Sequence, residues 1–468
     1  MKKMISSLRE VVAATGLSDG MCISFHHHLR GGDYVLNMVM DEIAAAGIKD
    51  LTVNASSLFD CHLPLVSHIK SGVVTGLETN YVSAAIGKEL SAGVLKQPVI
   101  FRSHGLRASD IVTGRSVIDV AFIAAPTSDP MGNCTGKIGP SACGSLGYAY
   151  ADAEYAKKTV IITDNLVSYP LQMRSIQEIN VDYVAVVDSI GDPQGIVSGT
   201  TKMPKDPIAL RIAEYAAKAI ESSGLLRDGF SFQTGAGGAS LAVAGFLKEI
   251  MLKKGIKGSF ALGGITGYLV DMMEQGCFQS LQDVQCFDLK AVDSICRNPN
   301  HIEISAAQYA SPTAKSTAAN SLDVVVLGAT QIDKNFNVNV HTDSSGYLMG
   351  GSGGHTDVAA CAKLTIIVAP LSRARTSIVV DKVKCVSTPG ESIDLLVTEY
   401  GITVNPLRTD LLEVLAQSKL PIVSIQQLLT TSVALNGIPE ETNEREARVI
   451  GEVYNRDNRM IDVIYQIL

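Results

Sequence analysis

The sequence predicts an α/β protein with two tandem, internally repeated domains, each built on a mainly parallel sheet covered by helices. Short apolar runs alternate along the chain with Ala-rich segments of helical periodicity, which is the rhythm of βαβ units. In addition, the segment 118–133 is echoed by the segment 322–337 at a constant offset. The matched polar positions are Asp119, Asp129 and Asn133 in the first copy and Asp323, Asp333 and Asn337 in the second. A repeat of this length indicates two domains of one fold rather than a solenoid.

The expected elements follow from these runs in chain order. In the first half, strands are predicted at 48–53, 98–101, 118–124, 159–163 and 183–187. In the second half, strands are predicted at 231–233, 260–262, 324–327, 364–368 and 395–398. Helices are predicted at 34–46, 82–92, 208–222 and 241–250. A Pro-containing linker at 203–207 separates the halves, so we expect domains at 1–207 and 208–468.

Composition argues against several classes of protein. Apolar residues make up 46% of the chain but never form a run of about 18, the length of a membrane span. The polar segment 6–10 stands where a signal peptide would be apolar. Nine cysteines show no CxxC pair and no Cys/His metal spacing, which favours reduced thiols in a cytoplasmic protein and no metal site. A net charge of −8 gives no basic footprint for nucleic acid.

A glycine-rich loop after the strand at 231–233 is a candidate binding element. Ligands of open parallel sheets bind at the carboxyl ends of strands, and clefts between domains are preferred ligand sites. At Gly235, Gly237 and Gly238, backbone N–H groups and a helix N-terminus could meet a phosphate, carboxylate or thioester oxygen. The alternative is a tight βα turn. The loop is not a P-loop, because no Lys-Ser/Thr follows its last glycine.

A second loop is richer in glycine, with Gly350, Gly351, Gly353 and Gly354 preceding His355. Four glycines within five residues are costly to order. This cost favours a functional loop over a plain connector.

The corresponding loop of the first half carries cations instead of glycines. It contains His26, His27, His28 and Arg30. A neighbouring strand end adds Arg102, His104 and Arg107. Adjacent residues rarely converge on one metal, whereas arginine offers a bidentate fork to carboxylates. The pattern therefore predicts an anion site for a polycarboxylate, with solvated loop charge as the alternative.

Glu303 lies inside an apolar strand and has two interpretations. Because it alternates with Ile302 and Ile304, it either faces solvent or is a buried acid with a raised pKa, which would make it a site candidate. Asn133 and Asn337 are interpreted as turn-formers.

Several of these segments resemble a known family. The segments 129–133, 333–337 and 351–357 are similar to motifs of the CoA-transferase superfamily and, within it, of bacterial citrate lyase alpha subunits. Further matching runs lie at 24–27, 231–235, 260–266, 298–309 and 395–398. The resemblance covers essentially the whole chain, although family members usually carry an extra stretch before the first strand. Many CoA-transferases also use a Glu that becomes a glutamyl thioester, and the comparable stretch 262–267 contains no acid.

The resemblance implies an enzyme that converts acetyl-carrier protein and citrate into acetate and citryl-carrier protein. The exchange would run directly through a mixed anhydride without a covalent enzyme nucleophile. The protein would then supply positioning and donors for the two oxyanions. On this basis we assign acyl exchange to Gly351, Gly353, Gly354 and Glu303; the thioester and pantetheine arm to Gly235, Gly237, Gly238, Gly263 and Gly264; and citrate to His26, His27, Arg30, Arg102 and His104.

The resemblance also implies partners, namely an acyl carrier protein (gamma subunit) and a beta subunit that cleaves citryl-carrier protein. No cofactor is expected to be bound tightly by this chain, which would act on the CoA-derived prosthetic group of the carrier. Two other functions stay open. One is a CoA-transferase or acyl-CoA hydrolase that uses free CoA, and the other is a non-catalytic sugar-phosphate-sensing module on the same fold.

Overall fold

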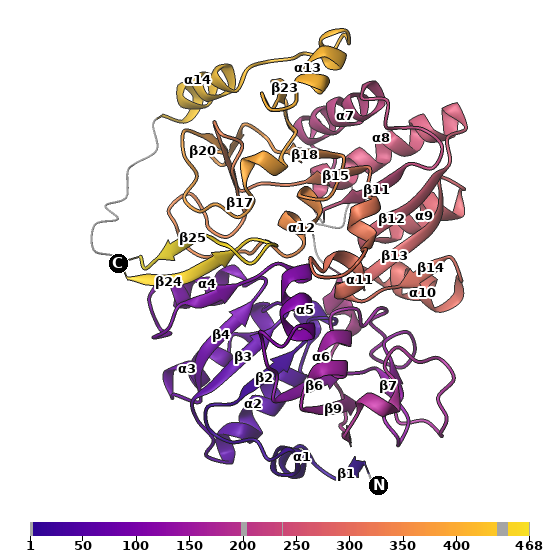
Figure 1. The fold of residues 1–468 in the computed structure, drawn as a ribbon, viewed down its shortest axis with the longest axis vertical. Coiled ribbons are helices and arrows are strands. Elements are labelled where there is room, and N and C mark those ends of the chain that lie inside the picture. The colour runs from indigo at the N-terminus through magenta and orange to yellow at the C-terminus, as the bar shows by residue number, and fades with distance from the viewer. Residues whose placement is uncertain (1–2, 198–203, 236, 438–447, 468) are drawn as a thin grey trace.

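The computed structural model describes residues 3–197, 204–235, 237–437 and 448–467. Residue 203 of the expected linker and Ala236 of the first glycine loop lie outside these ranges. Two large sheets dominate the structure, one in each half of the chain, stacked one above the other in Figure 1.

The first sheet has ten strands. In spatial order they are β1 (Met4–Ile5), β10 (Tyr183–Val186), β9 (Lys158–Thr163), β6 (Val120–Ala124), β2 (Cys22–Phe25), β3 (Leu51–Ala55), β4 (Val74–Thr79), β5 (Val99–Phe101), β24 (Val449–Tyr454) and β25 (Met460–Tyr465). The second sheet has eight strands. They are β14 (His301–Glu303), β13 (Phe278–Cys286), β12 (Gly258–Ile265), β11 (Ser231–Thr234), β15 (Val324–Leu327), β18 (Leu364–Val368), β22 (Leu395–Thr398) and β23 (Gly401–Val404).

The two sheets repeat one topology. The order β10-β9-β6-β2-β3-β4-β5 corresponds strand for strand to β22-β18-β15-β11-β12-β13-β14, and every neighbouring pair in both series is parallel. The chain order reverses between β6 and β2, and again between β15 and β11. Such switch points are where open parallel sheets bind ligands. The predicted tandem α/β repeat is therefore confirmed.

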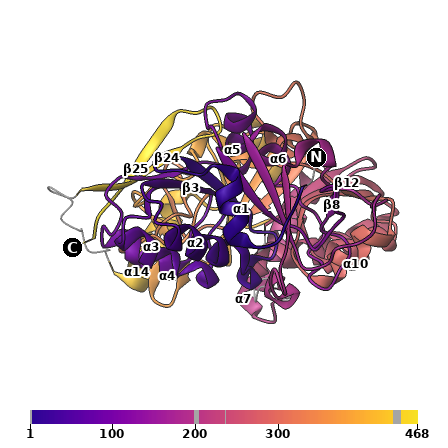
Figure 2. The same ribbon diagram turned by 90° about the horizontal axis from the view of Figure 1, so that it is seen from below.

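Helices cover both faces of the sheets. In the first half they are α1 (Leu8–Thr15), α2 (Val35–Ala45), α3 (Leu65–Lys70), α4 (Ala84–Ser91), α5 (His104–Val112) and α6 (Tyr150–Tyr155). Figure 2 shows α2 and α3 on one side of the first sheet and α5 and α6 on the other. The second half has α7 (Pro207–Ser222), α8 (Gly238–Lys254), α9 (Gly267–Glu274), α10 (Leu289–Arg297), α11 (Ala306–Ala310), α12 (His355–Ala359), α13 (Thr409–Ala416) and α14 (Ile425–Asn436). None of the helices in the described ranges is both long and apolar enough to cross a bilayer.

Short strand pairs complete the loops beyond the main sheets. They are β7 (Thr127–Ser128) with β8 (Cys134–Thr135), β16 (Gln331–Asp333) with β17 (Val338–Asn339) and β21 (Val379–Val380), and β19 (Ser372–Arg373) with β20 (Thr376–Ser377). The repeated Asp/Asn turns lie here. Asp129 Oδ1 accepts the backbone N–H of Asn133 at 3.2 Å, and Asp333 Oδ1 accepts that of Asn337 at 3.0 Å. The interpretation of both asparagines as turn-formers is confirmed.

The last two strands cross back to the first half. β24 pairs with β5 in parallel and β25 pairs with β24 in antiparallel fashion, so the yellow hairpin in Figure 1 extends the lower sheet. The division into 1–207 and 208–468 stays a prediction. This hairpin is the part of the chain that a single boundary near residue 207 does not describe.

Candidate active site

A cleft of about 350 Å³ lies between the two halves, at the carboxyl ends of strands from both sheets. Its lining residues are His27, Arg30, Ser57, Phe59, Tyr81, His104 and Tyr148 from the first half, and Gln233, Thr234, Gly235, Gly237, Gly263, Gly264, Val284, Gln285, Phe287, Tyr309, Leu327, Gly328, Gly351, Ser352, Gly353, Gly354 and His355 from the second. The loops after β2 and β11, which flank the two switch points, therefore open into one cleft.

Arg30 is the one permanent cation among the described residues that line this cleft, and no carboxylate lies among them. Its guanidinium carbon is 5.3 Å from the ring centroid of Phe59 and 4.5 Å from that of Phe287. Unlike Arg102 and Arg107, Arg30 forms no ion pair within the described ranges. Its φ of 50° is unusual for a residue with a side chain, and such strain concentrates at functional sites. This half-buried, unpaired guanidinium is suited to hold an anion.

Two imidazoles stand beside Arg30 and pack against one phenol ring and against each other, with the rings of His27 and His104 5.8 Å apart. The ring of Tyr148 lies 4.6 Å from the ring of His27 and 4.4 Å from that of His104. Burial lowers the pKa of His27 well below its usual value and lowers that of His104 to about 3. Both rings are therefore neutral near pH 7 and act as hydrogen-bonding groups. The cationic pocket predicted from the sequence is reduced to Arg30.

The other predicted citrate ligands do not line the cleft, because acidic neighbours hold them. His26 Nε2 lies 3.0 Å from a carboxylate oxygen of Asp152, with both side chains fully buried. Arg102 binds Glu78 at 2.7 Å and Asp110 at 2.8 Å. These contacts anchor the elements that carry His27 and His104, and the charge of Arg102 is already neutralised by its two carboxylates.

Glu303, named above as a catalytic candidate, also lies outside the cleft. Its carboxylate accepts the backbone N–H of Leu146 at 2.7 Å and the Ser175 hydroxyl at 2.9 Å, and it pairs with Lys137 Nζ at 2.9 Å. The side chain is 5% exposed, so it does not face solvent. All three partners come from the first half, so the contacts of Glu303 hold the two halves together.

The glycines of the site fall into two groups. A Cβ on Gly351, Gly354 or Gly264 would collide with the Asn80 carbonyl oxygen, the Tyr309 hydroxyl or the Phe287 ring, respectively. Packing alone requires these three glycines.

Gly235 and Gly237 have more space around the position of a Cβ. A Cβ on Gly235 would come no closer than 3.6 Å to a neighbour, and one on Gly237 no closer than 3.7 Å. Gly353 has a φ of +50°, and a Cβ on it would lie 3.2 Å from His104 Nε2. A Cβ on Gly263, which has a φ of +103°, would collide with the Gln233 side chain at 2.9 Å. Gly238 begins α8 just outside the lining. Packing therefore does not account for Gly235 and Gly237. The Gly235 N–H already donates to the Val326 carbonyl at 2.8 Å, so Gly237 and the N-terminus of α8 are left to meet a ligand.

Several lining residues carried no recognisable signal in the sequence. Tyr148 follows no predicted strand, and Tyr309 and Gln233 find each other only in the fold, with Gln233 Nε2 donating to the Tyr309 hydroxyl at 3.0 Å. Gln285 Nε2 donates to the His27 carbonyl at 2.7 Å across the two halves. The placement of Gln233 directly before the first glycine loop was the one available hint.

Asp357 fixes the N-terminus of α5 from the opposite half. Its carboxylate accepts the Gly105 N–H at 2.8 Å and the Ser103 hydroxyl at 2.7 Å. On the same side, His104 N–H donates to the Gly353 carbonyl at 2.8 Å. Burial raises the pKa of Asp357 to about 7 and outweighs these two hydrogen bonds, which lower it. The position of His104 thus depends on a carboxyl from the second half.

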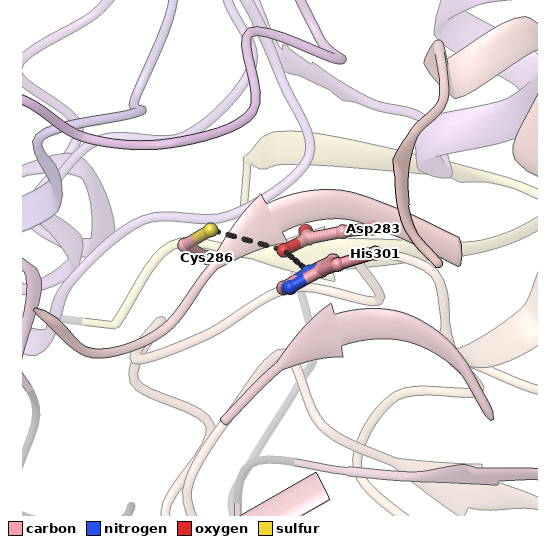
Figure 3. A group of neighbouring side chains, drawn as sticks. All are labelled: Asp283, Cys286 and His301. Atoms are coloured by element: carbon pink, nitrogen blue, oxygen red, sulfur yellow. Dashed lines mark hydrogen bonds and ion pairs between the residues drawn. The ribbon is translucent and has the colours of Figure 1, made fainter. Parts of the chain in front are cut away.

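A buried cluster of Asp283, Cys286 and His301 lies on strands β13 and β14 (Figure 3). Asp283 Oδ2 is 2.9 Å from His301 Nε2 and 3.0 Å from Cys286 Sγ. In a tetrahedral zinc site with bonds of about 2.0 and 2.3 Å, the oxygen and sulfur would be about 3.5 Å apart. Burial also raises the pKa of the Cys286 thiol well above its usual value. Protons therefore account for these contacts, and the cluster is a hydrogen-bonded one.

The fold and the cleft define a class of protein. Two tandem parallel α/β units of one topology, with glycine loops from one and polar loops from the other meeting in a shared cleft, give a CoA-transferase-like fold. An alpha subunit of malonate decarboxylase from Acinetobacter baumannii shares it with a TM-score of 0.68 over 93% of this chain and 88% of that chain. At 16% identity, this likeness concerns the fold alone.

Closer relatives identify the family. The family model described as citrate lyase, alpha subunit (CitF), matches residues 1–467. The citrate lyase alpha chain of Klebsiella pneumoniae is 48% identical over all of this chain and 92% of its own length, and that of Haemophilus influenzae is 47% identical, with 93% of its length covered. A crystal structure from Streptococcus mutans, described as the alpha subunit of citrate lyase in complex with citrate, has a TM-score of 0.98 at 49% identity, covering all of this chain and 92% of that one. The chain belongs to the citrate lyase alpha subunit family.

Proposed function

We propose that this chain is a citrate:acyl-carrier-protein transferase, which replaces the acetyl group on a carrier-protein thiol with a citryl group. The observation that carries the proposal is the unpaired Arg30 in a cleft whose other described lining residues are uncharged. A protein with a net charge of −8 needs such a local cation to hold a tricarboxylate against its overall field.

The two halves supply different parts of the site. Citrate lies against Arg30 and His27 in the first half, where a guanidinium fork can bind a carboxylate through two hydrogen bonds. The thioester and its pantetheine arm lie along the loop with Gly235 and Gly237, where the N-terminus of α8 offers free N–H groups. This assignment uses the loops that packing leaves open.

The exchange proceeds in two displacements. A citrate carboxylate oxygen attacks the acetyl thioester carbonyl, which forms a citryl-acetyl anhydride and releases the carrier thiolate. The thiolate then attacks the citryl carbonyl, which forms the citryl thioester and releases acetate. Both nucleophiles are already anions, so the chain has to supply orientation and donors for the two oxyanions rather than proton transfer.

A direct exchange leaves no acyl group on the enzyme. No carboxylate is found among the described lining residues, and Glu303 is held by Lys137. Incubation with acetyl-carrier protein alone, followed by hydroxylamine or borohydride trapping and mass spectrometry, should leave this chain unmodified. A trapped glutamyl adduct would refute direct exchange.

The proposed partners are a small acyl carrier protein, which brings the CoA-derived arm, and a beta subunit that cleaves citryl-carrier protein to oxaloacetate and acetyl-carrier protein. The cytoplasm is the proposed compartment, which agrees with nine unpaired cysteines. Affinity purification of the tagged chain from its own cells should recover both subunits. Thioester exchange should be fast with acetyl-carrier protein and slow with acetyl-CoA, and the opposite preference would favour an ordinary CoA-transferase.

A further inference from the structure

His104 presents an acceptor, not a cation, to the cleft. Asn80 Nδ2 donates to the Arg102 carbonyl at 2.8 Å and to the Ser103 carbonyl at 3.2 Å. These two bonds fix the amide, so its oxygen faces His104 Nδ1 at 3.1 Å. An amide oxygen can only accept, and Nδ1 must therefore carry the proton. Nε2 is left with its lone pair.

The ring cannot turn to offer its N–H instead. His104 is the first residue of α5, and its own N–H is bound to Gly353. One face of the ring packs on Tyr148 at 4.4 Å. The low pKa described above keeps Nε2 unprotonated throughout the neutral range. The lone pair thus faces the cleft beside the glycine loop, where a Cβ on Gly353 would lie 3.2 Å from Nε2.

An acceptor in this place discriminates among acids. Carboxylates and thioesters are themselves acceptors, and a carboxylate oxygen against the lone pair would be repelled. Near pH 7 the hydroxyl is the single donor that citrate carries. A site that hydrogen-bonds a substrate hydroxyl rejects the analogue lacking it, because its buried partner is then left unpaired.

We propose that His104 Nε2 accepts the hydroxyl of the substrate and makes this cleft selective for hydroxy-tricarboxylates over their deoxy analogues. The inference rests on the proposed function, since it takes citrate as the acid in the cleft. It assigns His104 a role in specificity that is distinct from the charge recognition by Arg30.

The test compares citrate with tricarballylate, which has the same three carboxylates and no hydroxyl. Wild type should bind citrate about 10–100-fold more tightly, the range expected for one hydrogen bond to a buried group. His104→Phe keeps an aromatic ring against Tyr148 and should reduce this ratio to below about threefold. His104→Gln, whose amide oxygen can accept, should retain part of it. Calorimetry gives both dissociation constants, and circular dichroism verifies folding.

His27→Phe is the matched control, because His27 also stacks on Tyr148, at 4.6 Å. It should weaken both acids alike and leave their ratio unchanged. Equal binding of the two acids by wild type would overturn the inference and leave the proposed function standing. A wild-type ratio retained in His104→Phe would also overturn it. Absence of any citrate binding to wild type would overturn the proposed function and the inference together.

Discussion

The loops after β2 and β11 occupy the same place in the repeated topology and do opposite things. The loop after β2 brings bulky polar groups, among them His27 and Arg30, to the switch point of its sheet. The loop after β11 brings Gly235 and Gly237, which leave space around them and lead into the uncapped N-terminus of α8. The same fold thus provides a loop of polar side chains, including the cation Arg30, on one side of the cleft and a glycine-rich loop on the other. Duplication supplied the geometry, and divergence of a few residues per loop supplied the chemistry.

The largest effect is expected at Gly353, where the glycine loop of the second half approaches His104 of the first half. Gly353→Val should lower transferase activity by about two orders of magnitude or more, in line with the loss of an oxyanion donor, because a side chain there would press on His104. Gly255→Val is the matched control. Gly255 also has a positive φ, of 70°, but has no neighbour within 4 Å and lies at the end of α8. Steady-state kinetics at equal folded fraction would decide, and wild-type turnover of the Gly353 variant would remove this loop from the site.

Comparing two arginines can separate substrate binding from structural stabilisation among the cations of the first half. Arg30→Ala should raise the citrate KM by about 10–100-fold, the value of a charge-assisted hydrogen bond, and change the carrier-protein KM little. Arg102→Ala should mainly lower thermal stability, because it leaves Glu78 and Asp110 without their partner. If instead Arg30→Ala weakened the carrier and spared citrate, the cation would hold the phosphates of the prosthetic arm.

The stabilising contact between Asp357 in the second half and the N-terminus of α5 in the first half should depend on pH. Its pKa is about 7 in the folded protein and ordinary, near 4, when unfolded. Folding therefore favours the protonated form, and its contribution to stability is full below the unfolded pKa and is lost as pH rises through about 7. The free energy of unfolding of wild type should fall relative to Asp357→Asn between pH 5 and 8, by at most about 1.4 kcal/mol per pH unit. Denaturant titrations of both proteins test this, and a constant difference would contradict it.

The smallest expected effect concerns the bond from Gln285 to the His27 carbonyl. Gln285→Ala should cost about 1 kcal/mol of stability, typical of one hydrogen bond, and should loosen the loop after β2. Gln279→Ala, an exposed position on the same strand, should cost nothing measurable. Chemical denaturation gives the free energy of unfolding of both variants. Equal free energies would show that the loop after β2 is stable without this hydrogen bond.

Much of the fold could be predicted because buried parallel strands are almost entirely apolar. The predicted runs 324–327, 364–368 and 395–398 are strands β15, β18 and β22 to the residue. Strands β4 and β13 were not predicted, because Thr, Gly, Glu, Gln and Asp interrupt their sequences. Their polar side chains have partners elsewhere in the chain, such as His301 for Asp283. Local patterns cannot show such partners.

The sequence could predict where the candidate site lies, but not which of its side chains carry an unpaired charge. Glycines and cations after strands pointed to loops that line the cleft, since strand ends gather at one edge of a sheet. Whether a side chain is free to bind an anion depends on acids far away in the sequence: Asp152 lies against His26, and Glu78 neutralises Arg102. Residue type alone also could not show that burial keeps His27 and His104 neutral.

The hairpin of β24 and β25 has a consequence for synthesis of the protein. Strand β5 receives its outer neighbour only from residues 449–454, so the first sheet keeps an open edge while some 350 residues are still being translated. An unprotected edge of this kind recruits strands from other chains. A nascent or C-terminally shortened chain should therefore aggregate through β5, even though every residue that lines the cleft has already been made.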